Sequence, residues 1–541
     1  MRLNGITLNA QDELVPRMAG RAWRLGFAVL LVAAAASLTM PVQAGAQDWA
    51  GHGFDSWNTS FNPFEWAISP HTVAKLAPKW KFTTGGDVSA RAAVVNGVVY
   101  FPDWGGNLWA VDARTGKEIW GNQLSTYGLV NPSYARATPS IADGVLYIGT
   151  QQGAWFLAID AATGKLIWKT ELETVDPNAI VTTGATIVDG IVYTGVASTA
   201  EALPSGGPGL AKGSVVALDA HTGKIIWKTY STVAGYTGVG VWGSSPVVDR
   251  DRHTLYIGTG DNYAAPTDPN YISCTGLGGT PANCQSADNH VDSILALDTY
   301  SGKIKWSYRA VTWDQAGVTS GSDFFNLSCF LPVGGVCPTP TGPDFDFGSA
   351  PNMITYWTPW GPKTILGAGQ KSGIYYAFDP DSGKVLWQTQ VGPGSSLGGM
   401  EWGSATDGRR IYVAITNYYG IPWSGSGASG SAGFFAALDP ETGKVLWQTA
   451  DPNGAIDLGE ITVANGVVYA PSAGGLASDP TMLALDAATG KILWSYQAGS
   501  SVIAGAAVSN GVVYWGSGYT HLGLPGLTGG NTFYAFSING N

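Results

Sequence analysis

The sequence predicts an all-β protein, an eight-bladed β-propeller formed by a single domain. Three observations favour it: a turn motif that recurs seven times, a hairpin signal before most of its copies, and an incomplete eighth unit at the end of the chain. The 75 glycines argue against a mostly helical chain, and the 11% of aromatic residues argue against disorder. The formal net charge of −11 excludes the basic footprint that a nucleic-acid-binding protein needs.

The first 46 residues have the pattern of an export signal. Arg17, Arg21 and Arg24 precede an apolar run over residues 25–38, and small residues follow. This run is shorter than the roughly 20 residues that a membrane-spanning helix needs. We therefore expect cleavage after Ala44 or Ala46 rather than a retained anchor, which leaves residues 47–541 as one domain in the periplasm.

The recurring motif has the form A-x-D-x-x-T/S-G-K-x-x-W. Before most copies stands a second signature, apolar residues around Asn-Gly or Asp-Gly, as in VVNGVVY over residues 94–100. Asn-Gly between alternating apolar residues predicts a tight hairpin, so each unit reads as four short strands. Such a unit is a propeller blade, and we expect its tryptophan to pack between blades. The seven copies begin at Ala110, Ala158, Ala217, Ala296, Ala377, Ala437 and Ala484.

The eighth unit, which starts at Ala506, lacks its last strand. A matching strand is available near the N-terminus, where residues 76–85 include Trp80. Pairing of that N-terminal strand with the last blade would close the ring and leave no exposed sheet edge.

Eight blades with this motif resemble the quinoprotein alcohol dehydrogenases, which bind pyrroloquinoline quinone (PQQ) and a calcium ion on the axis of the ring. The resemblance covers residues 48–541. The blade motif alone does not indicate activity, because a non-catalytic outer-membrane assembly propeller shares it. The residues on the axis must therefore decide between the two.

Arg136, Thr182 and Trp242 occupy equivalent positions, each seven residues before the turn aspartate of its blade. We expect their side chains to converge on the mouth of the channel. A tricarboxylate quinone needs a cation, a hydroxyl donor and a flat aromatic floor, and the resemblance implies that these three residues contact it. Thr183 is the alternative to Thr182, and a further plate between blades is the alternative role for Trp242.

Two loops contain the metal ligands that the resemblance implies. Glu201 lies in VASTAEA, and GTGDNY offers Asp261 or Asn262. Calcium prefers such hard oxygen ligands. The alternative is that these acidic loops are ordinary solvated turns.

The stretch TWDQAGV over residues 312–318 resembles the family segment that contains the catalytic base. The resemblance implies that Asp314 takes the substrate proton and also binds the metal, and Ala316 implies calcium rather than a lanthanide. The alternative for Asp314 is a loop carboxylate paired with a nearby arginine.

Two more segments resemble family strands beside the quinone. Lys371 in GAGQKSGIYYAFD is the implied second catalytic residue, which would donate to the quinone oxygen as charge develops. Glu401 and Trp402 stand where the family has an Asn-Trp pair, so Glu401 departs from the pattern.

The four cysteines form two local pairs, Cys274 with Cys284 and Cys329 with Cys337. In an oxidising compartment they would form two loop disulfides, although three connectivities are open and free thiols are the alternative. The sequence has no C-x-x-C-H motif and hence no c-type haem site. The resemblance then implies an external cytochrome c as electron acceptor.

The combination of VASTAEA, GTGDNY and YARATPS is similar to polyvinyl alcohol dehydrogenases, which oxidise the secondary hydroxyls of a polymer. Two insertions, residues 263–291 and 317–352, would form either a cleft rim that admits a chain or a plain surface elaboration. The sequence therefore predicts a PQQ- and Ca²⁺-dependent periplasmic dehydrogenase that converts secondary alcohol groups to ketones. The alternatives are a quinoprotein dehydrogenase for small alcohols and a non-catalytic propeller scaffold of the cell envelope.

Overall fold

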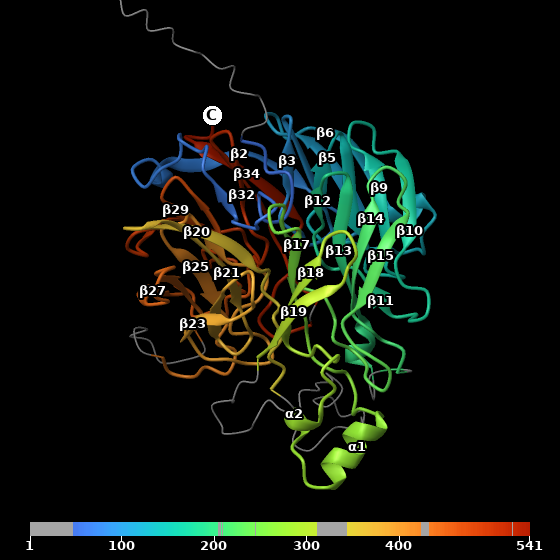
Figure 1. Cartoon of the computed structure of the whole chain (residues 1–541). Coiled ribbons are helices and arrows are strands. Elements are labelled where there is room, and N and C mark those ends of the chain that lie inside the picture. The colour runs from blue at the N-terminus through green and yellow to red at the C-terminus, as the bar shows by residue number, and fades with distance from the viewer. Residues whose placement is uncertain are drawn as a thin grey trace, which may run out of the picture. The chain divides into compact units, whose positions relative to one another are not determined.

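The structure, a computed structural model, describes residues 47–541 except residues 204–206, 208, 244, 311–342, 424–431 and 522. Its strands form eight sheets, each with four strands in meander order, and two of the sheets gain an extra short strand. Figure 1 shows the chain passing from one sheet to the next from blue to red. The predicted eight-bladed β-propeller is confirmed.

The first four blades take their strands in chain order. They consist of β3 (Ala93–Val95), β4 (Val98–Pro102), β5 (Asn107–Asp112) and β6 (Glu118–Gln123); β7 (Ser140–Ala142), β8 (Val145–Gly149), β9 (Trp155–Asp160) and β10 (Leu166–Glu171); β12 (Thr186–Val188), β13 (Ile191–Ser198), β14 (Ser214–Asp219) and β15 (Ile225–Tyr230), with β11 (Ala179–Ile180) added to β13; and β16 (Val247–Asp249), β17 (Thr254–Gly258), β18 (Ser293–Asp298) and β19 (Ile304–Arg309).

The remaining blades follow the same plan. They consist of β20 (Asn352–Thr358), β21 (Gly361–Gly369), β22 (Ile374–Phe378) and β23 (Val385–Gln390); β24 (Ala405–Thr406), β25 (Ile411–Ile415), β26 (Phe434–Leu438) and β27 (Val445–Ala450); β28 (Thr462–Ala464), β29 (Val467–Pro471), β30 (Met482–Asp486) and β31 (Ile492–Tyr496), with β1 (Phe61–Asn62) added to β28; and β32 (Ala507–Ser509), β33 (Val512–Gly516), β34 (Thr532–Ile538) and β2 (Leu76–Thr83).

The last blade joins the two ends of the domain. Strand β2 pairs antiparallel with β34, from Leu76 opposite Ile538 to Thr83 opposite Thr532. The N-terminal strand is therefore the fourth strand of the eighth sheet, and the ring does not depend on an incomplete blade.

The turn motif is explained by contacts between neighbouring blades. Asp219 accepts hydrogen bonds from the backbone and hydroxyl of Thr222, at 2.8 and 2.7 Å, which closes the turn. Gly223 has φ +71°, and a Cβ there would lie 2.5 Å from the ring of Trp168 in the preceding blade. The indole of Trp168 also donates to the carbonyl of Ala220 at 2.9 Å. The tryptophan thus needs the glycine of the next blade.

The same packing continues around the ring and accounts for the repeat. The tryptophan–glycine pairs are Trp80 with Gly116, Trp120 with Gly164, Trp168 with Gly223, Trp227 with Gly302, Trp306 with Gly383, Trp387 with Gly443 and Trp447 with Gly490. The tryptophan of the seventh copy, Trp494, instead donates to the carbonyl of Leu76 in the closing strand, at 3.0 Å. The prediction that these tryptophans are structural is confirmed.

The strand order places two kinds of loop at opposite ends of the sheets. The short hairpins and T-G-K turns lie at one end, and the longer loops lie at the other. The loop between β17 and β18 contains α1 (Pro269–Gly276) and α2 (Pro281–Cys284), which Figure 1 shows below the sheets. Cys274 and Cys284 form a disulfide there, as expected. Cys329 and Cys337 lie outside the described residues.

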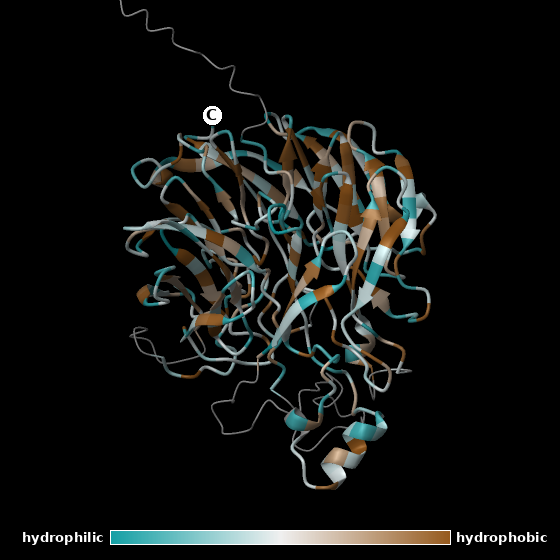
Figure 2. Cartoon of the chain, in the orientation of Figure 1, coloured by the Kyte–Doolittle hydropathy of each residue, from teal (hydrophilic) through white to brown (hydrophobic). Residues whose placement is uncertain are grey.

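Hydrophobic residues follow the strands, whereas the outer loops are mostly hydrophilic or neutral (Figure 2). Three short 3₁₀ helices complete the described elements: η1 (Val73–Lys75), η2 (Leu124–Tyr127) and η3 (Thr199–Ala202). Within the described part of the chain, none of the helices has the length and apolar character required to cross a membrane.

Candidate active site

A small polar cavity lies at the centre of the ring, where residues from six of the eight blades line it. Arg136, Thr182 and Trp402 are among the lining residues. Arg136 and Thr182 each stand four residues before the innermost strand of their blade, β7 or β12. Counting back from the turn aspartate therefore located residues that the fold brings to the axis.

The aromatic side chains of the cavity are held in a fixed arrangement. The rings of Trp242 and Trp402 pack edge to face with centroids 5.2 Å apart. The guanidinium of Arg136 lies 3.8 Å above the ring centroid of Trp402. The hydroxyl of Thr182 donates to the carbonyl of Trp242. Trp242 is thus a component of the axial cluster and not one of the plates between blades.

The two threonine candidates differ in their surroundings. The hydroxyl of Thr183 lies in hydrogen-bond distance of Thr194 and of the backbone of Gly195, each at 3.0 Å, inside the blade. Thr182 lines the cavity. The geometry therefore favours Thr182 for contact with a ligand.

Lys371 is the centre of the charged part of the site. It lies in the turn between β21 and β22, and its Nζ is 3.0 Å from Asp344 Oδ1 and 3.3 Å from Asp346 Oδ2. The indole of Trp242 donates to Asp346 Oδ2 at 2.7 Å. The ammonium also lies 4.9 Å from the ring centroid of Trp242. Lysine, tryptophan and two aspartates thus form one buried network.

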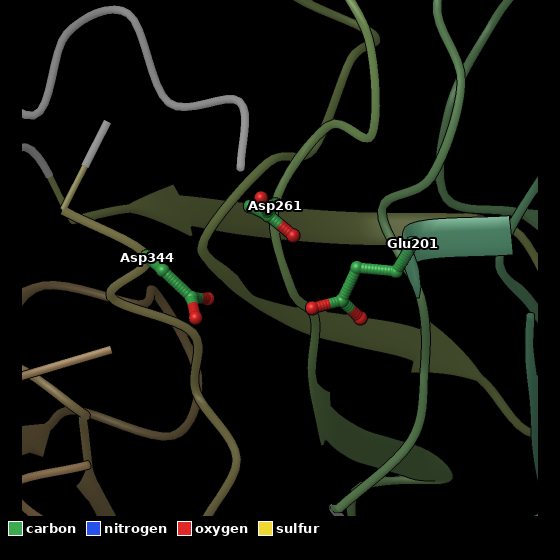
Figure 3. A group of neighbouring side chains, drawn as sticks. All are labelled: Glu201, Asp261 and Asp344. Carbon is green, nitrogen blue, oxygen red and sulfur yellow. The ribbon is translucent and has the colours of Figure 1, made fainter. Parts of the chain in front are cut away.

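Three carboxylates converge beside this network. Glu201, Asp261 and Asp344 each offer an oxygen within 4.8 Å of the other two. Figure 3 shows their side chains directed toward a common space. Glu201 comes from η3, Asp261 from the loop after β17, and Asp344 from the segment that leads to β20. Such a set of hard oxygens suits a metal ion that prefers oxygen ligands.

Asn262, the alternative to Asp261, has a different contact. It is fully buried, and its Oδ1 accepts a hydrogen bond from Asn289 at 3.1 Å. Of the two adjacent residues, Asp261 is the one whose carboxylate joins Glu201 and Asp344.

Burial perturbs the acidic groups of the site. It raises the pKa of Glu201 to about 7, with Lys371 opposing the shift, and raises the pKa values of Asp261 and Asp344 well above their usual range. Burial also works to lower the pKa of Lys371, but the charges of Asp344 and Asp346 outweigh it and raise that pKa. One ammonium group therefore compensates only part of the negative charge that three ionised carboxylates would have.

Glu401 lies near the same charges. It is buried, and burial raises its pKa to about 7, while Lys371 and Arg136 act in the opposite direction. Two further polar atoms at the axis, Asp346 Oδ1 and Trp402 Nε1, are buried with no hydrogen-bond partner among the described residues. A bound ligand would satisfy both atoms if it offered an acceptor oxygen to the Nε1–H of Trp402 and a donor or a metal ion to Asp346 Oδ1.

The structure therefore brings together every sequence-predicted site residue that it describes except Asn262, whose amide is engaged elsewhere. Asp314 and Ala316 lie outside the described residues, so their roles stay predictions. Sequence reasoning missed Asp344 and Asp346, which belong to GPDFDFG at the end of the second insertion. The available signal was a pair of aspartates alternating with phenylalanines between glycines, a composition unusual for a solvated loop.

Comparisons with known proteins identify the family of the chain. The family described as "Outer membrane protein assembly factor BamB" matches residues 66–273 and 370–533. A polyvinylalcohol dehydrogenase of Sphingopyxis sp. is 30% identical over 562 residues, which cover 93% of this chain and 78% of that protein. Another, from Pseudomonas sp., is 28% identical and covers 92% of this chain and 78% of its own length.

The chain belongs to the quinoprotein alcohol dehydrogenase family. Two solved structures share the fold. A quinohemoprotein alcohol dehydrogenase from Pseudomonas putida superposes with a TM-score of 0.69 at 19% identity, covering 92% of this chain and 81% of that one. A europium-containing methanol dehydrogenase superposes with a TM-score of 0.67 at 17% identity, covering 91% and 98%. The predicted membership of this family is confirmed, and it favours an enzyme over a scaffold.

Proposed function

We propose that this quinoprotein alcohol dehydrogenase uses PQQ and Ca²⁺ to oxidise secondary alcohol groups, those of polyvinyl alcohol in particular, to ketones. The observation that carries the proposal is the axial cluster, in which the three carboxylates Glu201, Asp261 and Asp344 stand beside Lys371 and Asp346. The polymer enters the proposal because two relatives that align with over 90% of the chain are named polyvinylalcohol dehydrogenases.

The cavity residues fit an anionic, planar cofactor. Arg136 supplies a cation, and Trp402 contributes both a flat ring and an Nε1–H that has no hydrogen-bond partner in the described part of the chain. Hydroxyl groups in the lining add further donors. Arginine binds carboxylates through strong, charge-assisted hydrogen bonds, and PQQ has three carboxylate groups.

The carboxylate trio fits a calcium ion. Three carboxylates, of which Asp261 and Asp344 are buried and Glu201 is partly buried, stand beside a single lysine and leave excess negative charge. Ca²⁺ binds carboxylate oxygens in flexible geometry. We therefore assign Glu201 and Asp261 as metal ligands and add Asp344, with Asp314 kept as a proposed ligand from the predicted family pattern.

In the mechanism, the bound quinone supplies the two-electron acceptor that side chains lack. Lys371 is held in place by Asp344 and Asp346, and its ammonium group would stabilise negative charge that develops nearby. Arg136 and Trp402 would orient the cofactor. Glu401 lies close enough to Lys371 and Arg136 for their positive charges to act on its pKa.

Proton removal from the alcohol needs an ionised carboxylate within reach. Asp314 is the base that the family resemblance predicts. Asp346 is a second candidate, because its Oδ2 is anchored by Trp242 and Lys371 while its Oδ1 has no hydrogen-bond partner among the described residues.

Location and electron acceptor complete the proposal. The N-terminal 46 residues have the features of an export signal, which supports a periplasmic enzyme. An external cytochrome c would then accept the electrons, and a relative from Thauera butanivorans is named 1-butanol dehydrogenase (cytochrome c), at 24% identity over 74% of this chain.

Dye-linked oxidation by the purified chain tests the proposal, with polyvinyl alcohol, a 2-alkanol and the matching 1-alkanol as substrates. We expect turnover only when both PQQ and Ca²⁺ are added, and faster turnover with the polymer and the 2-alkanol. Preference for the 1-alkanol would assign the enzyme to small primary alcohols. No turnover and no bound quinone would contradict the proposed function.

A further inference from the structure

A second pair of buried carboxylates lies away from the three-carboxylate cluster, in the loop between β27 and β28. Asp451 directly follows β27, and Asp457 precedes β28 by five residues. They are 5% and 1% exposed, respectively. Neither forms an ion pair with a lysine, arginine or histidine among the residues that the structure describes.

The oxygen atoms of this pair are only partly satisfied. Asp451 Oδ1 accepts hydrogen bonds from the backbone N–H groups of Asn453 and Ala455, at 2.7 and 3.1 Å. Asp451 Oδ2 and both carboxylate oxygens of Asp457 are buried with no hydrogen-bond partner in the described part of the chain. A buried carboxylate that keeps its charge without a donor or a counter-charge is strongly destabilising, so the ionised pair would need a cation.

From this geometry we propose that Asp451 and Asp457 form a second calcium site, a structural one between blades six and seven. One shared proton would join one oxygen of each residue and leave the other oxygen of Asp457 without a partner. A cation bound by Asp451 Oδ2 and by both oxygens of Asp457 accounts for all three, and Ca²⁺ accepts bidentate carboxylates.

The surroundings of Asp457 supply a further oxygen. The carbonyl of Ile415 and the Oδ2 of Asp457 lie 2.8 and 2.6 Å from the point where a Cβ on Gly433 would stand. The backbone N of Asp457 lies 2.6 Å from the same point, so Gly433 packs closely against this side of the carboxylate and leaves no room for a larger side chain.

The loop that contains the pair also builds the axial cavity. Leu458 packs in the cluster that contains Trp402, and Glu460 lines the cavity. The hydroxyl of Thr416 donates to the carbonyl of Asp457 at 3.2 Å and ties the loop to blade six. An ion bound to this loop would therefore stiffen one wall of the cofactor cavity without contacting the cofactor.

Metal content after dialysis of the PQQ-loaded protein against CaCl₂ tests the proposal. We expect two calcium ions per wild-type chain, one in Asp451→Asn/Asp457→Asn, one in Glu201→Gln/Asp261→Asn, and none in the fourfold variant. Calcium in Glu201→Gln/Asp261→Asn that is lost in the fourfold variant supports the second site even if the axial site proves inactive. Equal calcium content in wild type and Asp451→Asn/Asp457→Asn would overturn it.

Thermal unfolding gives an independent readout. In the Glu201→Gln/Asp261→Asn background, which removes the axial ligands, we expect CaCl₂ to raise Tm by about 2–5 °C. Adding Asp457→Asn should abolish that rise, and far-UV circular dichroism checks that the variant is folded. If Asp457→Asn instead raises Tm without calcium, and calcium has no effect in the background protein, the pair shares a proton and the proposal is wrong.

Discussion

The turn aspartates of the blades and the acidic residues of the axis are the same chemical groups in opposite surroundings. In the turns, Asp112, Asp160 and Asp219 accept hydrogen bonds from a threonine hydroxyl and from backbone N–H groups, which lower their pKa values. The chain itself thus supplies the hydrogen-bond donors of each turn carboxylate. These residues are ionised over the whole physiological range and serve the fold.

On the axis, burial dominates and raises the pKa values of Glu201, Asp261, Asp344 and Glu401. Here the described residues leave carboxylates without enough donors or cations, and Lys371 and Arg136 are the only cations among them that oppose the excess charge. The comparison teaches that a repeat stabilises itself, whereas a ligand site is completed by what it binds.

The largest effect should follow removal of the base at the axis. If Asp346 takes the substrate proton, Asp346→Asn lowers kcat by roughly 10³–10⁴-fold, while the protein still binds quinone, because the isosteric amide cannot accept the proton. Steady-state dye reduction and quinone absorbance measure the two properties. Asp314→Asn is the matched variant, and a loss confined to Asp314→Asn would identify Asp314 as the base and contradict the role of Asp346.

The contact between blades should respond to one methyl group. Gly223→Ala places a Cβ against Trp168 at a φ of +71°, and we expect it to destabilise the protein by roughly 2–4 kcal/mol. Gly190→Ala is the control, because its φ is +74° but nothing lies within 4 Å of the added Cβ. Equal losses of Tm in the two variants would show that the tryptophan contact adds nothing.

The pH dependence of stability should distinguish the two classes of carboxylate. Since the folded pKa of Glu401 is raised to about 7, its protonated form favours folding below the unfolded value of 4.5, and this contribution is lost as pH rises to about 7. We expect the metal- and quinone-free protein to lose roughly 2–3 kcal/mol over that window through Glu401. Glu401→Gln should flatten the curve of Tm against pH, and an unchanged curve would contradict the assignment.

The smallest effect is expected in a turn. The lowered pKa of Asp112 stabilises the fold above the unfolded value of 3.8, and this contribution disappears as pH falls below it. Because the group is mostly solvated, Asp112→Asn should lower Tm by only about 1 °C at pH 7. Calorimetry at pH 7 and at about pH 3 measures the difference, which should shrink in acid, and a larger difference in acid would reverse the expected sign.

The propeller was predictable because its information is local and repeated. A T-G-K turn, an Asn-Gly hairpin and a tryptophan define a blade wherever they occur, and the antiparallel order then fixes which residues reach the axis. Arg136, Thr182 and Trp242 were located by that counting alone. The missing strand at the C-terminus likewise predicted the pairing that β2 makes with β34.

The remaining site residues lie outside the repeat. Asp344 and Asp346 come from the insertion between β19 and β20, where no periodicity relates sequence position to the axis. The preference for Asp261 over Asn262 depends on the long-range contact of Asn262 with Asn289, 27 residues away. Spacing within a loop cannot supply such information, because the loop path is set by the blades that it packs against.

A spectroscopic titration of the metal-free protein with PQQ, with and without CaCl₂, tests the central claim most directly. We predict one bound quinone per chain in the presence of calcium, and much weaker binding without calcium or in Glu201→Gln/Asp261→Asn. Quinone binding of equal strength in all three cases would contradict the assignment of the axial carboxylates to a metal ion. Absence of quinone binding under every condition would contradict the cofactor site itself.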